Sequence, residues 1–269
     1  MPSSVNPSAM AQTTIALENI GKTYGGRAVL DGLSLAVREG EFLAVVGESG
    51  SGKTTLLRLI NRLIDADNGT VRVDGEDVRN VDPIALRRRI GYVFQGIGLF
   101  PHLDVADNIA ITPRLLGTDR ASIAARVDEL IELVRLDRTA HRHRFPHELS
   151  GGERQRVGVA RALAARPRIV LMDEPFGALD PLTRDALGQD YRRLHDELGL
   201  TTVMITHDML EAILLADRIA VLRGGQVVAE GTPRELTAAG QDAYVSELMQ
   251  TPRRHAEKLR ELLGGPSPA

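Results

Sequence analysis

The chain has 269 residues, with 33 lysines and arginines against 36 aspartates and glutamates and no cysteine. This length predicts one large domain or two small ones with a core that needs no disulfide. The lack of cysteine excludes disulfide frameworks, thiolate metal sites and cysteine nucleophiles. The net charge of -3 gives no sign of nucleic-acid binding. The longest apolar runs are far shorter than the roughly 20 residues of a membrane span, and residues 1–13 are expected to be a disordered tail without an export signal.

Short apolar runs alternate with amphipathic stretches along the main part of the chain, residues 14–236. This alternation predicts an α/β fold with a largely parallel sheet. Two earlier segments, 15–24 and 33–37, alternate apolar and polar residues around a Gly-Gly turn and predict an antiparallel β edge on that sheet. Helices are expected at 53–63 and 122–134. Buried strands are expected at 42–46, 169–172, 202–205 and 219–222.

The alternation of strand and helix patterns changes in two places. Between about residues 96 and 166 the sequence is almost free of strand patterns, which predicts a helical subdomain inserted into the α/β core. Residues 237–269 predict a C-terminal helical extension. In it, Thr251 is expected to cap a last helix with Pro252 in its first turn, running to Leu263 before Gly264 and its neighbours end it.

A glycine-rich segment lies between the expected strand 42–46 and helix 53–63, and it matches the pattern G-x-x-x-x-G-K-[ST]. Glycines let the backbone N–H groups curl around a phosphate, and the following helix N-terminus adds its positive dipole end. Lys53 would reach the terminal phosphates, and the Thr54 hydroxyl would hold Mg²⁺. The expected phosphate-binding residues are Gly47, Glu48, Ser49, Gly50, Ser51, Gly52, Lys53, Thr54 and Thr55.

Two carboxylates, Asp173 and Glu174, directly follow the expected strand 169–172. At the carboxyl end of a strand beside a phosphate loop, the first would bind the Mg²⁺ of a nucleotide and the second would orient the attacking water. Without the phosphate loop they would be an ordinary acidic strand end.

A second helix start with unusual residues begins at Leu149-Ser150-Gly151-Gly152-Glu153. Ser150 and Glu153 form a capping box, which is a purely structural explanation. It does not account for two glycines in the first turn, since each costs about 1 kcal/mol relative to alanine. Exposed backbone donors for an anion would account for them, although the phosphate loop already provides one such site.

Together these motifs resemble the nucleotide-binding subunit of an ATP-binding cassette (ABC) transporter, over about residues 14–236. In that family Leu149–Gln155 is the signature sequence, and two subunits pair head to tail so that the signature of one closes over the γ-phosphate of ATP held by the other. The resemblance therefore implies that Ser150, Gly151, Gly152 and Glu153 act in trans.

The resemblance also implies roles for single residues at matching positions. Tyr24 corresponds to the aromatic residue that stacks on adenine, and Asp180 to the loop that communicates across the dimer. Gln95 corresponds to the glutamine that senses Mg²⁺ and the attacking water, and His207 to the histidine that contacts the γ-phosphate. The implied catalytic set is thus Glu174, His207 and Gln95, with Thr54, Gln95 and Asp173 around Mg²⁺. From the residues alone, Tyr24 also fits a core or edge aromatic, Asp180 a helix cap, and His207 a strand-end histidine.

The resemblance implies that the apolar loop 96–102 after Gln95 docks the membrane permease of the family, although from the residues alone this loop also fits ordinary core packing of the helical subdomain. The resemblance implies an ATPase at the cytoplasmic face of the membrane, paired with a copy of itself or a homologue, with permease subunits and indirectly an extracytoplasmic substrate-binding protein. Segments 92–109, 145–148 and 198–204 resemble importers of glycine betaine, choline or related quaternary amines. Importers of amino acids or polyamines share much of this sequence, so they stay open as alternatives.

Two other classes of protein share parts of this sequence pattern. A soluble ABC ATPase acting on DNA or ribosomes would carry a longer insertion or two cassettes, and a stand-alone kinase or GTPase would have no use for Leu149–Gln155. Two charged clusters are interpreted as solvated surface instead of a metal site or a nucleic-acid site. They are His141, His143 and His147, and Arg87–Arg89.

Overall fold

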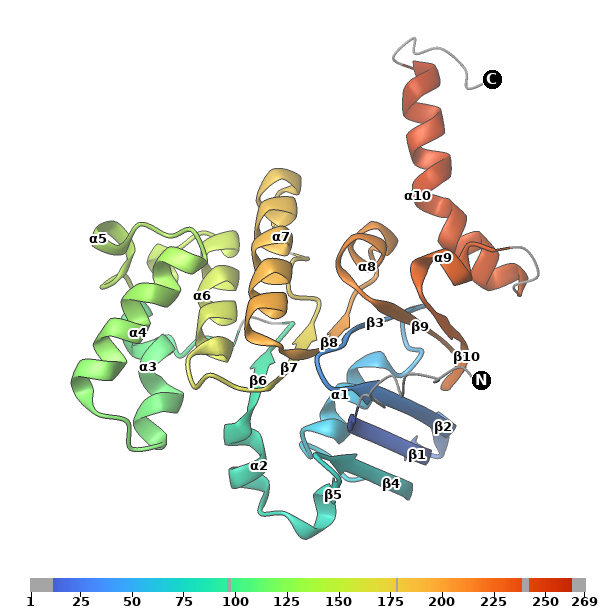
Figure 1. The fold of residues 1–269 in the computed structure, drawn as a ribbon, viewed down its shortest axis with the longest axis horizontal. Helices are drawn as coiled ribbons and strands as arrows, with labels where there is room; N and C mark the ends of the chain where they lie inside the picture. The colour runs from blue at the N-terminus through green and yellow to red at the C-terminus, as the bar shows by residue number, and fades with distance from the viewer. Residues whose placement is uncertain (1–11, 96–97, 178, 239–241, 263–269) are drawn as a thin grey trace, which may run out of the picture.

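The computed structural model describes residues 12–95, 98–177, 179–238 and 242–262. Its centre is a six-stranded sheet with the order β10-β9-β3-β8-β7-β6, in which only the edge strand β10 runs antiparallel to its neighbour (Figure 1). The strands are β3 (Phe42–Gly47), β6 (Ile90–Val93), β7 (Ile169–Asp173), β8 (Thr201–Ile205), β9 (Arg218–Arg223) and β10 (Gln226–Gly231). The predicted parallel core is confirmed, and its inner strands are mostly apolar because both faces are covered.

A second, four-stranded antiparallel sheet has the order β2-β1-β4-β5. Its strands are β1 (Thr13–Tyr24), β2 (Arg27–Arg38), β4 (Asn68–Val73) and β5 (Glu76–Asp77). The sequence predicted the first two as an edge of the main sheet. Instead β1 pairs with β2 and β4, because its buried side chains pack onto a face of the main sheet and leave its edges free to pair. β1 starts one residue inside the expected tail, and residues 1–11 lie outside the described part.

The two faces of the main sheet enter different cores, as the period of two along a strand requires. In β3, Phe42, Ala44 and Val46 point into a core shared with helices that follow later in the chain, whereas Leu43 and Val45 point to the second sheet and to α1 (Lys53–Ile60). Helix α1 is three residues shorter than predicted, and the chain leaves it through Arg62 at a φ of 46°.

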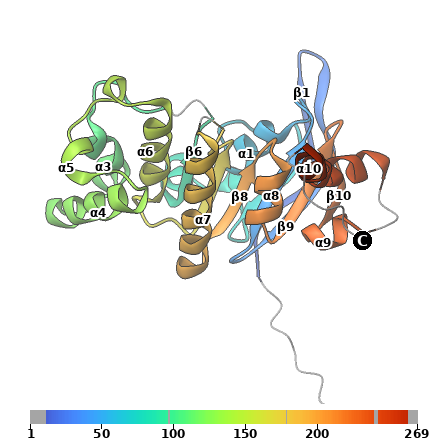
Figure 2. The ribbon, with the colours of Figure 1, turned by 90° about the horizontal axis from the view of Figure 1, so that it is seen from above.

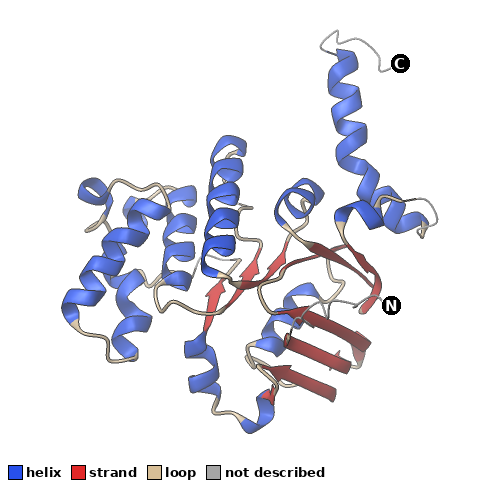
Figure 3. Cartoon of the chain, viewed as in Figure 1, coloured by secondary structure: helices blue, strands red, loops and turns tan. Residues whose placement is uncertain are grey.

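The helices between β6 and β7 form a group at one end of the molecule, away from the second sheet (Figures 2 and 3). An aspartate or serine side chain caps the N-terminus of each, which is why the chain can form several short helices in succession. They are α3 (Val105–Leu115), α4 (Arg120–Leu133), α5 (Arg138–His141) and α6 (Gly151–Leu163), with a 3₁₀ turn at Pro146–Glu148. The described residues between Gly98 and Arg168 contain no strand. Whether they fold as a separate subdomain stays a prediction.

The remaining helices are α2 (Pro83–Arg89, after a 3₁₀ turn at Val78–Asn80), α7 (Pro181–Leu198), α8 (Met209–Leu215), α9 (Pro233–Leu236) and α10 (Ala243–Leu262). The prediction for the last helix is wrong at its start, because Thr251 and Pro252 lie inside α10 and the Thr251 hydroxyl donates to the carbonyl of Glu247 (2.9 Å). Val245 and Met249 are buried in the main core, so tertiary packing sets the helix start upstream of the local proline signal. The far end of α10 projects from the body (Figure 1), and Gly264 lies outside the described part. Over the described residues, none of the helices combines the length and the apolar character that crossing a bilayer requires.

Candidate functional site

The predicted site residues follow the carboxyl ends of adjacent parallel strands. The loops after β3, β6, β7 and β8 carry Lys53, Gln95, Glu174 and His207, and the turn after β9 carries Gly224. Because these strands run in the same direction, residues as distant in sequence as Lys53 and Gly224 meet at one edge of the sheet. There they line a cleft of about 770 Å³.

The phosphate loop leaves β3 at Gly47 and enters α1 after Gly52. A Cβ at Gly47 would lie 2.1 Å from the carbonyl oxygen of Leu222, and one at Gly52 would lie 2.5 Å from Leu30 Cδ2. The loop therefore passes so close to β9 and β2 that only glycine fits. The Lys53 ammonium donates to the carbonyl oxygens of Gly47 and Glu48, both at 2.8 Å, and so fixes the loop from its own C-terminal end.

The predicted cation ligands lie beneath this loop. The Thr54 hydroxyl donates to Asp173 Oδ1 at 3.2 Å, although they are 119 residues apart. Burial raises the pKa of the Asp173 carboxyl above its ordinary value, and burial lowers the pKa of Lys53 against the pull of Glu174 and Asp173. A hydroxyl and a carboxylate at the phosphate end of a cleft are the hard oxygen ligands that Mg²⁺ takes beside a nucleotide, so these residues fit that ion. The hydroxyl of Ser51 is buried without a hydrogen-bond partner in the same loop.

Glu174 is the point at which three predicted residues converge. Its Oε2 accepts from Gln95 Nε2 at 3.1 Å, and its Oε1 lies 3.4 Å from Nδ1 of His207. Its backbone is left-handed, with φ 49°, which a non-glycine residue adopts only at a conformational cost. Two bonds tie that backbone to distant segments, since Glu174 N–H donates to Ile205 O at 3.0 Å and Gln155 Nε2 donates to Glu174 O at 3.0 Å, and Gly177 N–H adds a local bond to Glu174 O at 3.3 Å. The bond from Gln155 links helix α6 to the site.

Other predicted residues lie outside this cleft. Tyr24 ends β1 and is 45% exposed; it pairs with Arg27, which does line the cleft. Asp180 caps α7 by accepting from the backbone N–H of Thr183 (3.0 Å), as predicted, and Ala178 beside it lies outside the described residues. Glu48 and Ser51 belong to the loop without lining the cleft.

The helix start at Ser150 forms the predicted capping box. Ser150 Oγ accepts from the N–H of Glu153 at 3.2 Å, and Glu153 Oε2 accepts from the N–H of Ser150 at 2.7 Å. These bonds, led by that from the Ser150 backbone, lower the pKa of Glu153 to about 2. His141 Nε2 lies 3.0 Å from Glu153 Oε1 and is largely buried, so the expectation that this histidine belongs to a solvated loop is wrong. In the described part of the chain no cluster of three or more metal-ligating side chains forms.

Sequence reasoning missed two parts of the site. Arg27, Ala28 and Val29 come from β2, and Gly224 and Gly225 from the β9–β10 turn. No local pattern marks them, because they reach the cleft only through the packing of one sheet on the other. The second is Tyr244 of α10, whose hydroxyl accepts from the backbone N–H of Glu48 at 3.1 Å and whose ring lies 4.6 Å from the Arg223 guanidinium.

An apolar groove of about 440 Å³ opens beside the site, between β6 and α3. Phe94 and Phe100 line it and are 42% and 41% exposed. The fully buried Asn108 holds the loop of Phe100, since it accepts from Phe100 N–H at 2.8 Å and donates to Phe100 O at 3.1 Å. Of the predicted docking loop, residues 96 and 97 lie outside the described part.

Comparison with known proteins gives a family match over residues 30–177, to the model described as ABC transporter. The chain is 48% identical over 236 residues to the choline transport ATP-binding protein OpuBA of Bacillus subtilis, which covers 87% of the chain and 62% of that protein. It is 47% identical to the glycine betaine uptake system ATP-binding protein YehX of Escherichia coli, covering 87% of the chain and 75% of YehX. It is 46% identical to the sulfate/thiosulfate import ATP-binding protein CysA of Caulobacter vibrioides, covering 86% and 68%. The chain thus spans about 62% of the length of the first of these relatives.

Among solved structures, the fold resembles the dimeric bacterial ABC transporter cassette MJ0796, with a TM-score of 0.76, 35% identity, and coverage of 81% of this chain and 98% of that one. A post-hydrolysis dimer of MJ0796 bound to ADP and Pi matches with a TM-score of 0.75. The predicted fold class is confirmed by these neighbours.

Proposed function

This chain belongs to the ABC transporter family, and from that premise we propose that it is the ATP-hydrolysing subunit of a membrane importer. The observation that carries the proposal is the Glu174 carboxylate, which is held between Gln95 and His207 at the mouth of a glycine-lined phosphate loop. A carboxylate so placed can orient a water molecule and accept its proton as the water oxygen attacks the γ-phosphorus of ATP, while the bond from that phosphorus to the β,γ-bridging oxygen breaks and ADP leaves.

Each side chain has a task in that reaction. The loop amides and Lys53 would bind the β- and γ-phosphates, and Thr54, Asp173 and Gln95 would hold Mg²⁺. When bound, this ion neutralises charge that develops on the phosphate oxygens. His207, 3.4 Å from Glu174, can donate to the γ-phosphate and keep the carboxylate in place.

We further propose that two copies, or this chain and a homologue, enclose ATP between them. Supporting this, Ser150–Glu153 begin α6 with two glycines and do not line the cleft of their own chain. A Cβ at Gly151 would meet only an arginine side-chain atom 3.9 Å away, so its backbone is accessible to an anion on a partner. The relative MJ0796 is a dimeric cassette.

The permease is proposed to dock in the groove between β6 and α3. Its aromatic rings are presented at the surface beside Gln95, and burial of apolar area there would stabilise the contact by about 25 cal/mol per Å². Bound in this way, the chain would work at the cytoplasmic face of the membrane, and a substrate-binding protein would deliver the solute on the other side.

The proposed cargo is glycine betaine, choline or a related quaternary amine. OpuBA and YehX, at 48% and 47% identity, support it by their named cargoes. The test is uptake of labelled choline, glycine betaine and sulfate by cells that express the chain with its permease. Uptake of sulfate alone would refute this cargo and leave the ATPase proposal standing.

The ATPase itself is tested with Glu174→Gln in the full chain. The amide keeps the size and the contacts of the side chain but accepts a proton poorly, so we expect ATP to bind normally while hydrolysis falls about 10²- to 10⁴-fold. Glu132→Gln, the same change at an exposed carboxylate of α4, is the matched control and should leave both unchanged. Rapid hydrolysis by Glu174→Gln would overturn the assigned role.

A further inference from the structure

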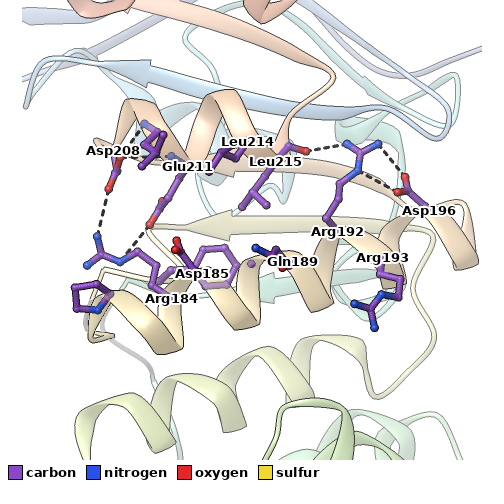
Figure 4. A pocket seen from close by; sticks show the side chains of 14 residues that line it. Arg184, Asp185, Gln189, Arg192, Arg193, Asp196, Asp208, Glu211, Leu214 and Leu215 are labelled. Carbon is purple, nitrogen blue, oxygen red and sulfur yellow. Dashed lines mark hydrogen bonds and ion pairs between the residues drawn. The ribbon is translucent and has the colours of Figure 1, made fainter. Parts of the chain in front are cut away.

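A second groove, of about 640 Å³, lies between α7 and α8, apart from the nucleotide cleft (Figure 4). Two arginines of α7, Arg184 and Arg192, reach across it toward α8 and the segments beside it. Each side chain is 27% exposed, and each forms ion pairs. Their partners differ, and the difference suggests different roles.

Arg184 joins the two loops on either side of the groove. Its Nη2 donates to the carbonyl oxygen of Leu179 at 3.2 Å, directly before Asp180. Its Nη1 donates to Asp208 Oδ2 at 3.2 Å, directly after His207, and its Nε lies 3.6 Å from Glu211 Oε1. One planar guanidinium thus contacts both the loop of Asp180 and the loop of His207.

The acidic partners are themselves fixed to the loop of His207. Glu211 Oε2 accepts from the Thr206 hydroxyl at 2.6 Å, and that hydroxyl accepts from the N–H of Asp208 at 3.0 Å. Asp208 also caps α8 by accepting from the N–H of Leu210 at 2.8 Å. Burial raises the pKa of the Glu211 carboxyl. A shift of Arg184 would therefore move or release the residues on both sides of His207.

We propose that Arg184 is a positioning residue that holds the Asp180 loop and the His207 loop in one fixed relation. Contact of the Asp180 loop with a second cassette would then set the position of His207 against the γ-phosphate. This inference rests on the proposed ATPase function and adds a residue that does not line the nucleotide cleft. A guanidinium suits the task because its donors lie in a rigid plane and bind several acceptors in fixed directions.

Arg192 provides a matched control on the same helix. It donates to Leu215 O at 2.8 Å and pairs with Asp196 and Asp217, both at 2.8 Å, so it joins α7 to the end of α8 without touching either loop. If Arg184 served only to hold α7 and α8 together, loss of either arginine would have similar consequences.

The experiment compares Arg184→Gln, Arg184→Lys and Arg192→Gln in the full chain, with melting temperature, equilibrium ATP affinity, kcat and KM as readouts. We expect Arg184→Gln to lower kcat on the order of ten- to a hundredfold with ATP affinity unchanged, as a displaced catalytic group does. Arg184→Lys should recover part of the loss, and Arg192→Gln should lower only the melting temperature. Equal kcat for Arg184→Gln and Arg192→Gln would overturn the inference.

Asp208→Asn keeps the α8 cap but removes the charge that Arg184 binds, so it carries the test if Arg184→Gln does not fold. It should lower kcat as Arg184→Gln does, and the double variant should be no slower than the slower single variant. Normal kcat in Asp208→Asn, or fully additive losses, would count against the coupling. A wild-type chain without ATPase activity would refute the proposed function itself. If the wild type hydrolyses ATP and Glu174→Gln does not, the variants of Arg184, Arg192 and Asp208 test the role of Arg184 alone.

Discussion

The close approach of the phosphate loop to β2 predicts that alanine at Gly52 damages both the fold and nucleotide binding. Its φ is 102°, and the new Cβ would lie 2.5 Å from Leu30 Cδ2 and 2.9 Å from the carbonyl oxygen of Val29. Backbone strain costs about 1–3 kcal/mol, and forcing the neighbouring chain to move costs about 1–3 kcal/mol more. We therefore expect a loss of about 2–6 kcal/mol of stability, and a displaced Lys53 at the start of α1.

Gly50→Ala is the control within the same loop. Gly50 has a φ of 79°, but its Cβ would meet nothing within 4 Å, so only the left-handed conformation should cost energy, about 1–2 kcal/mol. The assays are thermal unfolding, in which each kcal/mol corresponds to about 2–4 °C in Tm, and equilibrium binding of a fluorescent ATP analogue. Equal effects of the two substitutions, or normal ATP binding by Gly52→Ala, would refute the steric argument.

Three further predictions address the docking groove, α10 and the capping box. Phe100→Ala should weaken copurification with the permease while ATP binding persists. Phe145 is an aromatic residue of similar exposure (39%) outside the groove, so Phe145→Ala should leave copurification unchanged. Equal copurification of the two variants would contradict the docking site. Tyr244→Phe removes the hydroxyl that accepts from the Glu48 N–H but keeps the ring. ATP affinity should fall about two- to tenfold, which is the equivalent of one hydrogen bond of about 0.5–1.5 kcal/mol. An unchanged affinity would show that this contact does not contribute to nucleotide binding. Because the folded-state pKa of Glu153 is lowered from 4.5 to about 2, its contribution to stability is complete above pH 4.5 and is lost as the pH falls toward 2. The free energy of unfolding of Glu153→Gln should therefore fall less steeply with decreasing pH in that window than that of the wild type. The same slope in both proteins would argue against this contribution.

Much of the architecture could be predicted because the parallel core has an unambiguous sequence pattern. The run from Phe42 to Val46 is apolar throughout, as strands covered on both faces are, and the glycines after it mark the loop. The convergence of Gln95, Glu174 and His207 followed from the family resemblance together with the common edge of parallel strands.

What could not be predicted depends on contacts between distant segments. The local signals of Thr251 and Pro252 were those of a helix start, but the burial of Val245 and Met249 extends α10 upstream. The contact of Tyr244 with Glu48 spans 196 residues and leaves no periodic trace in the sequence. Likewise, alternation in β1 indicates a half-buried strand without saying which sheet it joins.

The left-handed backbone at Glu174 has a consequence for engineering this protein. The φ of 49° suits glycine, yet the position carries a side chain whose carboxylate the proposed reaction needs. Local conformational preference and chemistry thus favour different residues at this position. The hydrogen bonds that Glu174 N–H donates to Ile205 O and that Gln155 Nε2 donates to Glu174 O offset the cost of the left-handed backbone. With the role proposed for Glu174, a search for thermostable variants would favour glycine here and return well-folded but inactive proteins, so this position is one to hold constant in any such selection.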